Sequence, residues 1–290
     1  MPWKNPWFQY ALLLFLAFIW GSSFILMKIG LRSFSSNQAA ALRIFSASLV
    51  LLPYSIKSIK GLKKQDFKYL LITGFVGSFI PAFLFTKAQT RIDSALAGML
   101  NSMTPVFTLI IGVVIYRFRT KGIQLLGLFI GLVGALGLIT AGKEITLGNI
   151  DSYALLIILA TLCYGVNVNV VKAHLTHLSG IQISSLSFMF IGPFALSYLL
   201  ASDLNSVIVT DSWGIPFTAL MILGIIGTAF AMLIMYNLIR YTTAVFAASV
   251  TYIIPVFAIS WGFLDGENIT IIQLGSMAVV LLGVYLVNRR

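Results

Sequence analysis

The chain has 290 residues, of which 59% are hydrophobic and only 9% are charged, and its mean hydropathy is +0.98. Soluble domains carry about 25% charged residues, so this composition excludes a water-soluble globular protein and indicates an all-α polytopic membrane protein. The formal net charge of +11 does not indicate nucleic-acid binding, because the basic residues lie between apolar runs, where they act as orientation signals.

Apolar runs of about 20 residues are long enough to cross the hydrocarbon core of a bilayer. The sequence predicts ten transmembrane helices, at residues 8–29, 38–56, 67–88, 94–116, 123–141, 153–171, 180–201, 213–240, 244–263 and 269–287. No small-residue cleavage site follows the first run, so we expect it to be a retained helix rather than a signal peptide. The lipid bilayer is therefore an expected partner of this chain.

An internal repeat relates the two halves of the sequence. Residues 94–107 (SALAGMLNSMTPVF) and 244–257 (AVFAASVTYIIPVF) align at an offset of 150, which pairs Pro105 with Pro255. The polar segment 142–151 separates the halves, so we expect one five-helix repeat over residues 1–142 and a second over 150–290. Because five is odd, the second repeat must enter the membrane from the opposite face, which makes the two repeats inverted.

Lys and Arg are distributed unequally between the two sides of the membrane. With the N-terminus inside, 13 of the 19 fall on the inner side and 5 on the outer side, and Arg43 falls within a span. Since inner loops carry the excess of basic residues, the sequence predicts that both termini are cytoplasmic in a cell (inner or plasma) membrane.

Polar and aromatic residues recur at matched positions inside the predicted spans. Trp20 and Ser23 share one helix face, and an offset of 144 places Tyr164 and Asn167 at the equivalent positions of the sixth span. We predict a substrate cavity near the bilayer midplane; packing or interhelical hydrogen bonding is the alternative for each residue. The candidate substrate-binding residues are Trp20, Ser23, Arg43, Asn101, Tyr164, Asn167, Thr251 and Tyr252.

Pro105 and Pro255 lie at matched depth in the fourth and ninth spans. A proline inside a helix frees the carbonyl group one turn earlier, and in a membrane that group must be met by a neighbouring helix, a hydroxyl or water. We expect both prolines to bend their helices around the cavity and to act as hinges. A kink that serves only packing is the alternative.

Arg43 is a charged residue within a span, and such a charge at the bilayer centre costs about 2.5 to 3.5 kcal/mol. It lies little more than one turn from the start of the second span. Two placements are therefore open: the guanidinium faces an anion or carboxylate, or it stays at the helix end, where it snorkels to the outer membrane surface or pairs with a neighbouring group.

Several functional classes find no support in the sequence. It contains no P-loop motif, and His174 and His177 are its only histidines, so we expect neither ATP-driven transport nor a metal site. All eight acidic residues map to loops or span ends, which leaves proton coupling undecided. Cys163 is expected to be a buried spectator. We expect no catalytic residue and no cofactor.

Five segments carry a resemblance to a known family: WGSSFILMK (20–28), AALRIF (40–45), KAQTRIDSALAGMLNSMTPVF (87–107), YGVNVNVVK (164–172) and TTAVFAASVTYIIPVF (242–257). By these segments and their order along the sequence, the chain resembles the EamA family of the drug/metabolite transporter superfamily. The resemblance implies a carrier of ten helices in two inverted repeats, which exports metabolites, amino acids or toxic compounds across a bacterial inner membrane. It also implies that Arg43 matches an arginine of the family, whereas the second half has Ser187 at the corresponding place.

The sequence therefore predicts a secondary active or facilitative transporter that exports a small metabolite, amino acid or drug-like solute by alternating access. The coupling ion, the direction of transport and a homodimeric assembly stay open. The alternative is a membrane-embedded enzyme or a lipid-handling protein. That alternative requires a cluster of reactive side chains at the membrane interface, and the sequence offers none.

Overall fold

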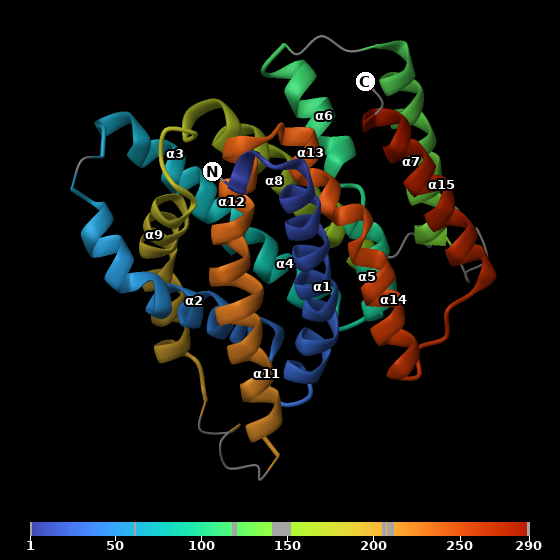
Figure 1. Cartoon of the computed structure of the whole chain (residues 1–290). Helices are drawn as coiled ribbons and strands as arrows, with labels where there is room; N and C mark the ends of the chain where they lie inside the picture. Colours follow the sequence, from blue (N-terminus) through green and yellow to red (C-terminus); the bar gives the residue numbers. More distant parts are fainter. Residues whose placement is uncertain are drawn as a thin grey trace.

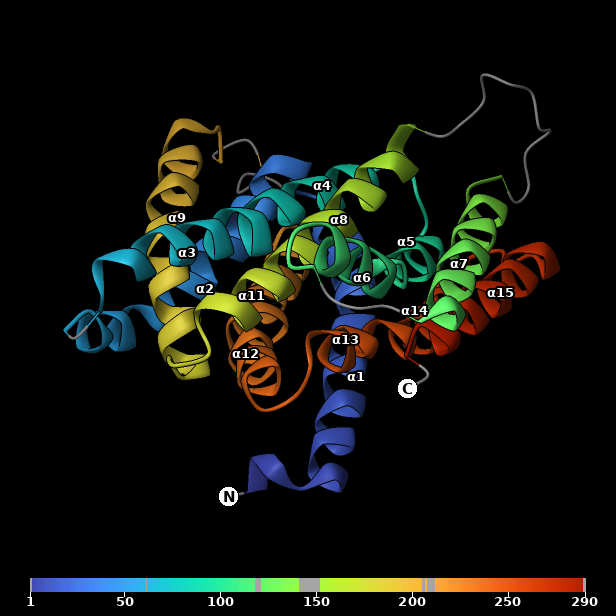
Figure 2. The ribbon, with the colours of Figure 1, turned by 90° about the horizontal axis from the view of Figure 1, so that it is seen from above.

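The computed structural model describes residues 2–60, 62–117, 121–140, 152–204, 207 and 212–288, and every regular element in these residues is helical. Figure 1 shows a bundle in which α2, α3 and α9 lie on one side and α7 and α15 on the other, with α1, α11 and α12 between them. The view from above in Figure 2 shows the same division. The predicted all-α fold is confirmed.

Each half of the chain contributes seven labelled helices to the bundle. Those of the first half are α1 (Pro6–Gly30), α2 (Ser36–Ser58), α3 (Lys64–Gly74), α4 (Ile80–Ala88), α5 (Ser94–Asn101), α6 (Thr104–Val114) and α7 (Gly122–Thr140). Those of the second half are α8 (Ser152–His174), α9 (Gly180–Ala201), α11 (Gly214–Gly224), α12 (Ala231–Tyr241), α13 (Ala244–Ala248), α14 (Ile254–Leu264) and α15 (Ile271–Asn288).

Eight helical segments in the described residues are long and apolar enough to cross a membrane. They are α1, α2, α3 with α4, α5 with α6, α8, α9, α11 with α12, and α13 with α14. Helices α7 and α15 are also apolar, but their apolar stretches are shorter. The chain is thus a multi-pass membrane protein. The segment 142–151, expected to separate the halves, lies outside the described residues.

Two helices begin with the same capping arrangement, 144 residues apart. Ser35 accepts a hydrogen bond from the backbone N–H of Gln38, whose side chain in turn accepts one from the backbone of Ser35. Ser179 and Gln182 repeat this reciprocal capping box at the start of α9. A capping box satisfies two backbone donors that the first helical turn leaves open. The two helices that it starts, α2 and α9, pack against each other.

Two spans contain a π-helical turn, which the sequence analysis did not predict. The turn Phe75–Phe79 connects α3 to α4, and the turn Ile225–Phe230 connects α11 to α12. A π-helical turn pairs residue i with i+5, so it inserts one residue and rotates the helix face that follows. The two turns begin 150 residues apart in the chain, at equivalent places in the two halves.

The fourth and ninth predicted spans are broken helices. Helix α5 ends at Asn101 and α6 begins at Thr104, while a 3₁₀ turn, Ser249–Tyr252, separates α13 from α14. Pro105 and Pro255 are each the second residue of the following helix, where no intrahelical N–H bond is required. Each proline therefore lies at the start of a helix, directly after a break in its span. The break lies just before each proline, at matched positions.

Close helix contacts depend on glycines at equivalent positions. A Cβ atom added to Gly21 of α1 would lie 2.5 Å from the Cβ of Phe257 in α14. A Cβ added to Gly165 of α8 would lie 3.0 Å from the Cβ of Phe107 in α6. The absence of a side chain lets the backbones approach, which is the usual basis of helix packing in membranes. Thus α1 meets α14 as α8 meets α6.

Candidate functional site

A cavity lies at the centre of the bundle, between helices from both halves. Within it, the centre of a water molecule can occupy about 90 Å³. Helices α1, α2, α5, α8 and α12 and both π-helical turns contribute to its wall. This space accommodates a small solute and is too narrow for a macromolecule.

Most of the residues predicted to bind substrate lie at this cavity. Its lining includes Trp20, Ser23, Arg43, Asn101, Tyr164, Asn167 and Thr251. Tyr252 is a half-buried residue that packs against the hydrophobic core and does not belong to the described lining. Pro105 and Pro255 are buried at the adjoining helix breaks, also outside that lining. The structure thus brings together side chains from five predicted spans of the first and second halves.

The π-helical turn Ile225–Phe230 holds two of these side chains. The indole Nε1–H of Trp20 donates a 2.9 Å hydrogen bond to the carbonyl oxygen of Gly227. The hydroxyl of Thr228 donates to the carbonyl oxygen of Leu223, five residues earlier, at 3.0 Å. Its oxygen accepts a 2.7 Å hydrogen bond from Nε of Arg43. The turn therefore fixes the orientation of both the indole and the guanidinium.

Arg43 faces the cavity rather than the membrane surface. Its Nε is held by Thr228, and its side chain forms part of the cavity wall. Of the two placements that the sequence left open, the structure shows the inward one. Snorkelling to the outer surface is wrong, because Thr228 lies on a neighbouring helix inside the bundle.

Three hydroxyls at the cavity are bonded to their own helices. Ser23, Thr104 and Thr251 donate to the carbonyl oxygens of Ile19, Asn101 and Ala248, respectively. A Ser or Thr that bonds back in this way keeps lone pairs available as acceptors.

Several buried polar atoms beside the cavity have no hydrogen-bond partner in the described structure. They include Oγ of Ser78, Oδ1 of Asn101, Oδ1 of Asn167 and the hydroxyl of Tyr236. Tyr236 lies beside Ser78 and Asn167. An unsatisfied buried polar group costs about 1 to 3 kcal/mol, so this side of the cavity has capacity for water or a polar solute group.

Apolar side chains form the rest of the wall. Phe24, Met27 and Phe85 line it from the first half, and Met232 and Met235 from the second. Methionine side chains are flexible and polarisable, and adapt to apolar groups of different shape. The cavity therefore combines a small set of fixed polar groups with an adaptable apolar surface, as small-molecule sites do.

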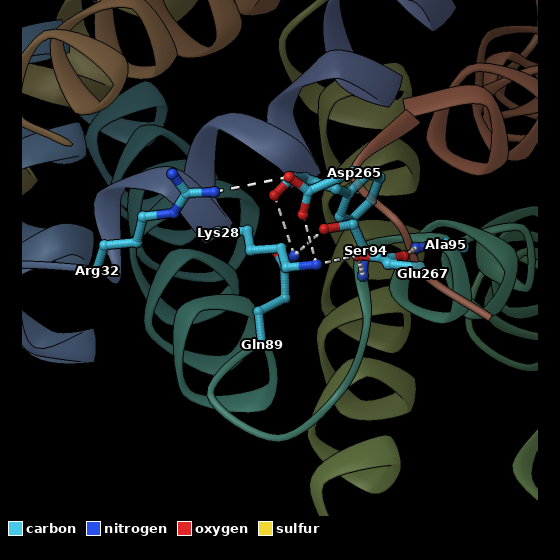
Figure 3. Close-up of polar contacts among 8 residues, drawn as sticks. Lys28, Arg32, Gln89, Ser94, Ala95, Asp265 and Glu267 are labelled. Carbon is cyan, nitrogen blue, oxygen red and sulfur yellow. Dashed lines mark hydrogen bonds and ion pairs between the residues drawn. The ribbon is translucent and has the colours of Figure 1, made fainter. Parts of the chain in front are cut away.

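An ion-pair cluster closes the end of α1, one residue beyond the cavity-lining Met27 (Figure 3). The ammonium of Lys28 lies 2.7 Å from a carboxylate oxygen of Asp265 and 2.7 Å from one of Glu267. Arg32 approaches Asp265 at 3.6 Å. The cluster joins α1 to the connection between α14 and α15, across the two halves of the chain.

Glu267 also caps helix α5 from outside. Its two carboxylate oxygens accept hydrogen bonds from the backbone N–H groups of Ser94 and Ala95, each at 3.0 Å (Figure 3). Asp93 is the N-cap residue of α5, but its side chain makes no capping bond. Burial, and then the negative charge of Glu267, raise the pKa of the Asp93 carboxyl above its ordinary value. Glu267 thus ties three elements together at this end of the cavity.

Lys172 is the counterpart of Lys28 at an offset of 144, and its contacts differ in kind. Its ammonium donates to the backbone carbonyl oxygens of Ile239, at 3.1 Å, and of Thr242. Ile239 also lines the cavity. Lys172 therefore joins α8 to the end of α12 through backbone carbonyls, where Lys28 uses two carboxylates.

Sequence reasoning missed Thr228, Ser78 and the two π-helical turns that carry them. The pairing of Gly77 with Gly227 at an offset of 150 was the available signal, because Ser78 and Thr228 follow these glycines directly. It also missed the pairing of Lys28 with Glu267, which lie 239 residues apart. In the described residues, no three His, Cys, Asp or Glu side chains gather as a metal site.

Comparisons with known proteins agree with this architecture. The sequence profile of the EamA-like transporter family matches residues 7–140 and again 151–289. The "Uncharacterized inner membrane transporter YedA" of Escherichia coli K12 is 24% identical, over 93% of this chain and 87% of that protein. A Salmonella typhimurium protein named "Probable amino-acid metabolite efflux pump" is 26% identical, over 95% of this chain and 93% of that protein.

A solved structure shares the fold. A crystal structure superposes with a TM-score of 0.68 at 15% sequence identity, and the match covers 96% of this chain and 95% of that one. Because the family profile spans both halves, the earlier resemblance of the motifs is confirmed. The chain belongs to the EamA-like transporter family and is a multi-pass membrane transporter.

Proposed function

We propose that this protein exports a small solute across the membrane by alternating access through the central cavity. The observation that carries the proposal is the cavity itself, which lies between two sets of helices and is lined by fixed polar groups at its centre. We assign solute contacts to Trp20, Ser23 and Asn101 on the first half. Export as the direction follows the printed name of the Salmonella relative.

The solute contacts on the second half are Tyr164, Asn167 and Thr251, with Tyr252 as a residue that enters the cavity when the α13–α14 break moves. Pro105 and Pro255 are the proposed hinges. Each follows a helix break, and such a break already lacks the hydrogen bonds that would resist bending.

The proposal includes two inverted five-helix repeats, over residues 1–142 and 150–290. Helix α3 (Lys64–Gly74) and helix α11 (Gly214–Gly224) begin and end at the same offset of 150, and so do α6 and α14. The two π-helical turns and the two capping boxes add further matched features. Helix α1 also begins, and α15 ends, toward the same end of the bundle (Figure 1), as an even number of crossings requires.

Equivalent interfaces between the repeats support two interchangeable conformations. Gly74 packs against the backbone of Ser187 on α9, and Gly224 packs against the backbone of Arg43 on α2. Ser187 and Arg43 are equivalent at an offset of 144. When the two interfaces have the same construction, each repeat can adopt the conformation of the other, which exchanges the open side of the cavity.

The two lysines close opposite ends of the cavity in this proposal. With both termini in the cytoplasm, the Lys28 cluster is the outer closure and the Lys172 contacts are the inner one. Outward opening must separate Lys28 from Asp265 and Glu267, whereas inward opening must release Lys172 from the end of α12.

A membrane-embedded enzyme is the rival function, and the cavity does not favour it. Its described lining contains no Cys, His, Asp or Glu that could serve as a nucleophile or general base.

The test is solute counterflow in proteoliposomes with Asn167→Leu. This change keeps the branched shape and the number of heavy atoms but removes the amide, so we expect transport to fall about tenfold or more while membrane insertion is unchanged. Asn169→Leu is a structural comparison, because Asn169 donates to the carbonyls of Thr108 and Gly165 instead. Undiminished flux through Asn167→Leu would remove this residue from the site, and absence of counterflow for every solute would refute transport.

A further inference from the structure

Arg43 presents an uncompensated cation to the cavity. Its Nε donates to Thr228, and no other hydrogen bond or ion pair joins its guanidinium to any described residue. The single bond turns the guanidinium so that its two terminal amino groups stay unbonded. A guanidinium in this arrangement keeps the pair of parallel donors that matches the two oxygens of a carboxylate.

The protein supplies no counter-charge for Arg43. No Asp or Glu belongs to the described lining of the cavity. Asp265 and Glu267, at the end of α1, pair with Lys28. Buried charges in proteins are normally paired, and a neutral hydroxyl such as that of Thr228 does not neutralise one. The negative charge that balances Arg43 must therefore come from outside the chain; otherwise water must solvate the guanidinium.

The remaining wall limits the number of charges on a bound solute. Arg43 is the single cationic side chain in the described lining, so it balances one negative charge. The same lining offers no carboxylate to pair with an ammonium group. Met27, Met232 and Met235 face the cavity with aromatic side chains beside them, which favours an apolar or aromatic body on the solute.

We propose that the solute is a monocarboxylate with an apolar body and no ammonium group, whose carboxylate pairs with the terminal nitrogens of Arg43. This assignment rests on the proposed transport function and specifies its substrate class. Thr228 is a positioning residue: it accepts from Nε and thereby aims the free side of the guanidinium at the solute. The role is not duplicated in the second half, where Ser187 holds the equivalent position.

Four probes that share a phenylethyl body and differ in their polar groups separate the charge states. They are 3-phenylpropanoate (anion), 3-phenylpropanamide (neutral), phenylalanine (zwitterion) and phenethylamine (cation). Each is added to the purified full-length protein, and binding is measured by the concentration-dependent rise in unfolding temperature. We expect the anion to bind about tenfold or more tightly than the other three. It is the probe that offers a carboxylate to Arg43 and carries no ammonium group, which the cavity wall has no carboxylate to pair with.

Variants assign the effect to one side chain. Arg43→Gln should weaken binding of the anion about tenfold or more, and Arg43→Lys should restore part of it, since it keeps the charge and loses the paired donors. Lys87→Gln removes the same charge from an exposed position and should bind the anion as the wild type does. If Arg43→Gln does not fold, Arg43→Lys with the four probes still shows whether the preference depends on the guanidinium.

The outcomes distinguish the substrate class from the function. Equal binding of anion and amide, or unchanged binding of the anion by both Arg43 variants, would overturn the monocarboxylate assignment. A panel extended to hexanoate and indole-3-acetate covers other apolar bodies. If no monocarboxylate binds while other solutes show counterflow in proteoliposomes, the assignment is wrong and the transport function stands. If no solute shows counterflow, the function itself fails.

Discussion

Replacing Glu267 with Gln perturbs the proposed outer closure of the cavity with little change in shape. The wild-type carboxylate receives the ammonium of Lys28 at 2.7 Å and two backbone N–H groups of α5 at 3.0 Å. In the wild type, one carboxylate oxygen accepts from both Lys28 and Ser94, and the other accepts from Ala95. A glutamine keeps one acceptor oxygen and must turn its NH₂ group toward a remaining donor. Lys28 keeps its contact with Asp265 in the variant.

The magnitude follows from these contacts. Removing one member of a buried ion pair costs about 3 to 5 kcal/mol, and the Glu267 side chain is only 2% exposed. The Lys28 side chain is 33% exposed and retains Asp265, so solvent and the second carboxylate reduce the loss. We therefore expect the closed form to lose about 2 kcal/mol, which is roughly 30-fold in the equilibrium between closed and open forms.

The assay measures access to the cavity from outside the cell. Cys163 is changed to Ser, Met27 at the cavity wall is changed to Cys, and a membrane-impermeant maleimide labels it in intact cells. Labelling in the Glu267→Gln background should be up to about 30-fold faster. Asp265→Asn should have a smaller effect, because Asp265 binds no helix terminus. Lys172→Met, at the other end, should not speed labelling from outside.

An unchanged labelling rate would refute this reasoning, provided that the variant elutes as a monodisperse protein. It would mean that the Lys28 cluster stabilises the fold without closing the cavity. Faster labelling with Lys172→Met as well would show instead that access depends on general loosening of the bundle.

Two further predictions concern stability. Gly21→Ala places a Cβ 2.5 Å from the Cβ of Phe257 and should destabilise the protein by about 1 to 3 kcal/mol. Gly275→Ala is the control, because its added Cβ would have no atom within 4 Å. Equal unfolding temperatures of the two variants would contradict the close contact at Gly21. The Asp93 carboxyl has a pKa raised by burial above its ordinary value of 3.8, so the folded protein retains a proton that the unfolded chain has lost. Stability should therefore fall as pH rises through this window. Asp93→Asn should abolish that fall in thermal melts, and an unaltered slope would exclude Asp93 as its source.

Hydropathy and spacing predicted the helices well. The described helix ends agree with the predicted span ends within three residues, because apolar runs, capping serines and short polar connections are local features. The matched residues Trp20 and Tyr164, and Ser23 and Asn167, also reached the cavity together as the 144-residue offset predicted. A repeated sequence places equivalent side chains at equivalent depths without any knowledge of the tertiary structure.

The cavity wall was predicted only in part, since the π-helical turns change which side chains face inward. Regular 3.6-residue spacing does not bring Thr228 toward Arg43; the added residue of the turn does. Tyr252 shows the opposite effect of local helix geometry. It directly follows Thr251, but the 3₁₀ turn directs it toward the packed core instead of the cavity.

The sequence alone determined that this chain resides in a membrane. It also predicted that its helices recur in two related sets and that certain polar residues line a cavity between them. These properties depend on composition and on neighbours a few positions away. Only the tertiary structure decided that Glu267 binds both Lys28 and the start of α5. It also decided that the Arg43 side chain donates to a hydroxyl group and not to a carboxylate. Such pairings join residues more than 170 positions apart, and chain distance places no constraint on which buried charges meet.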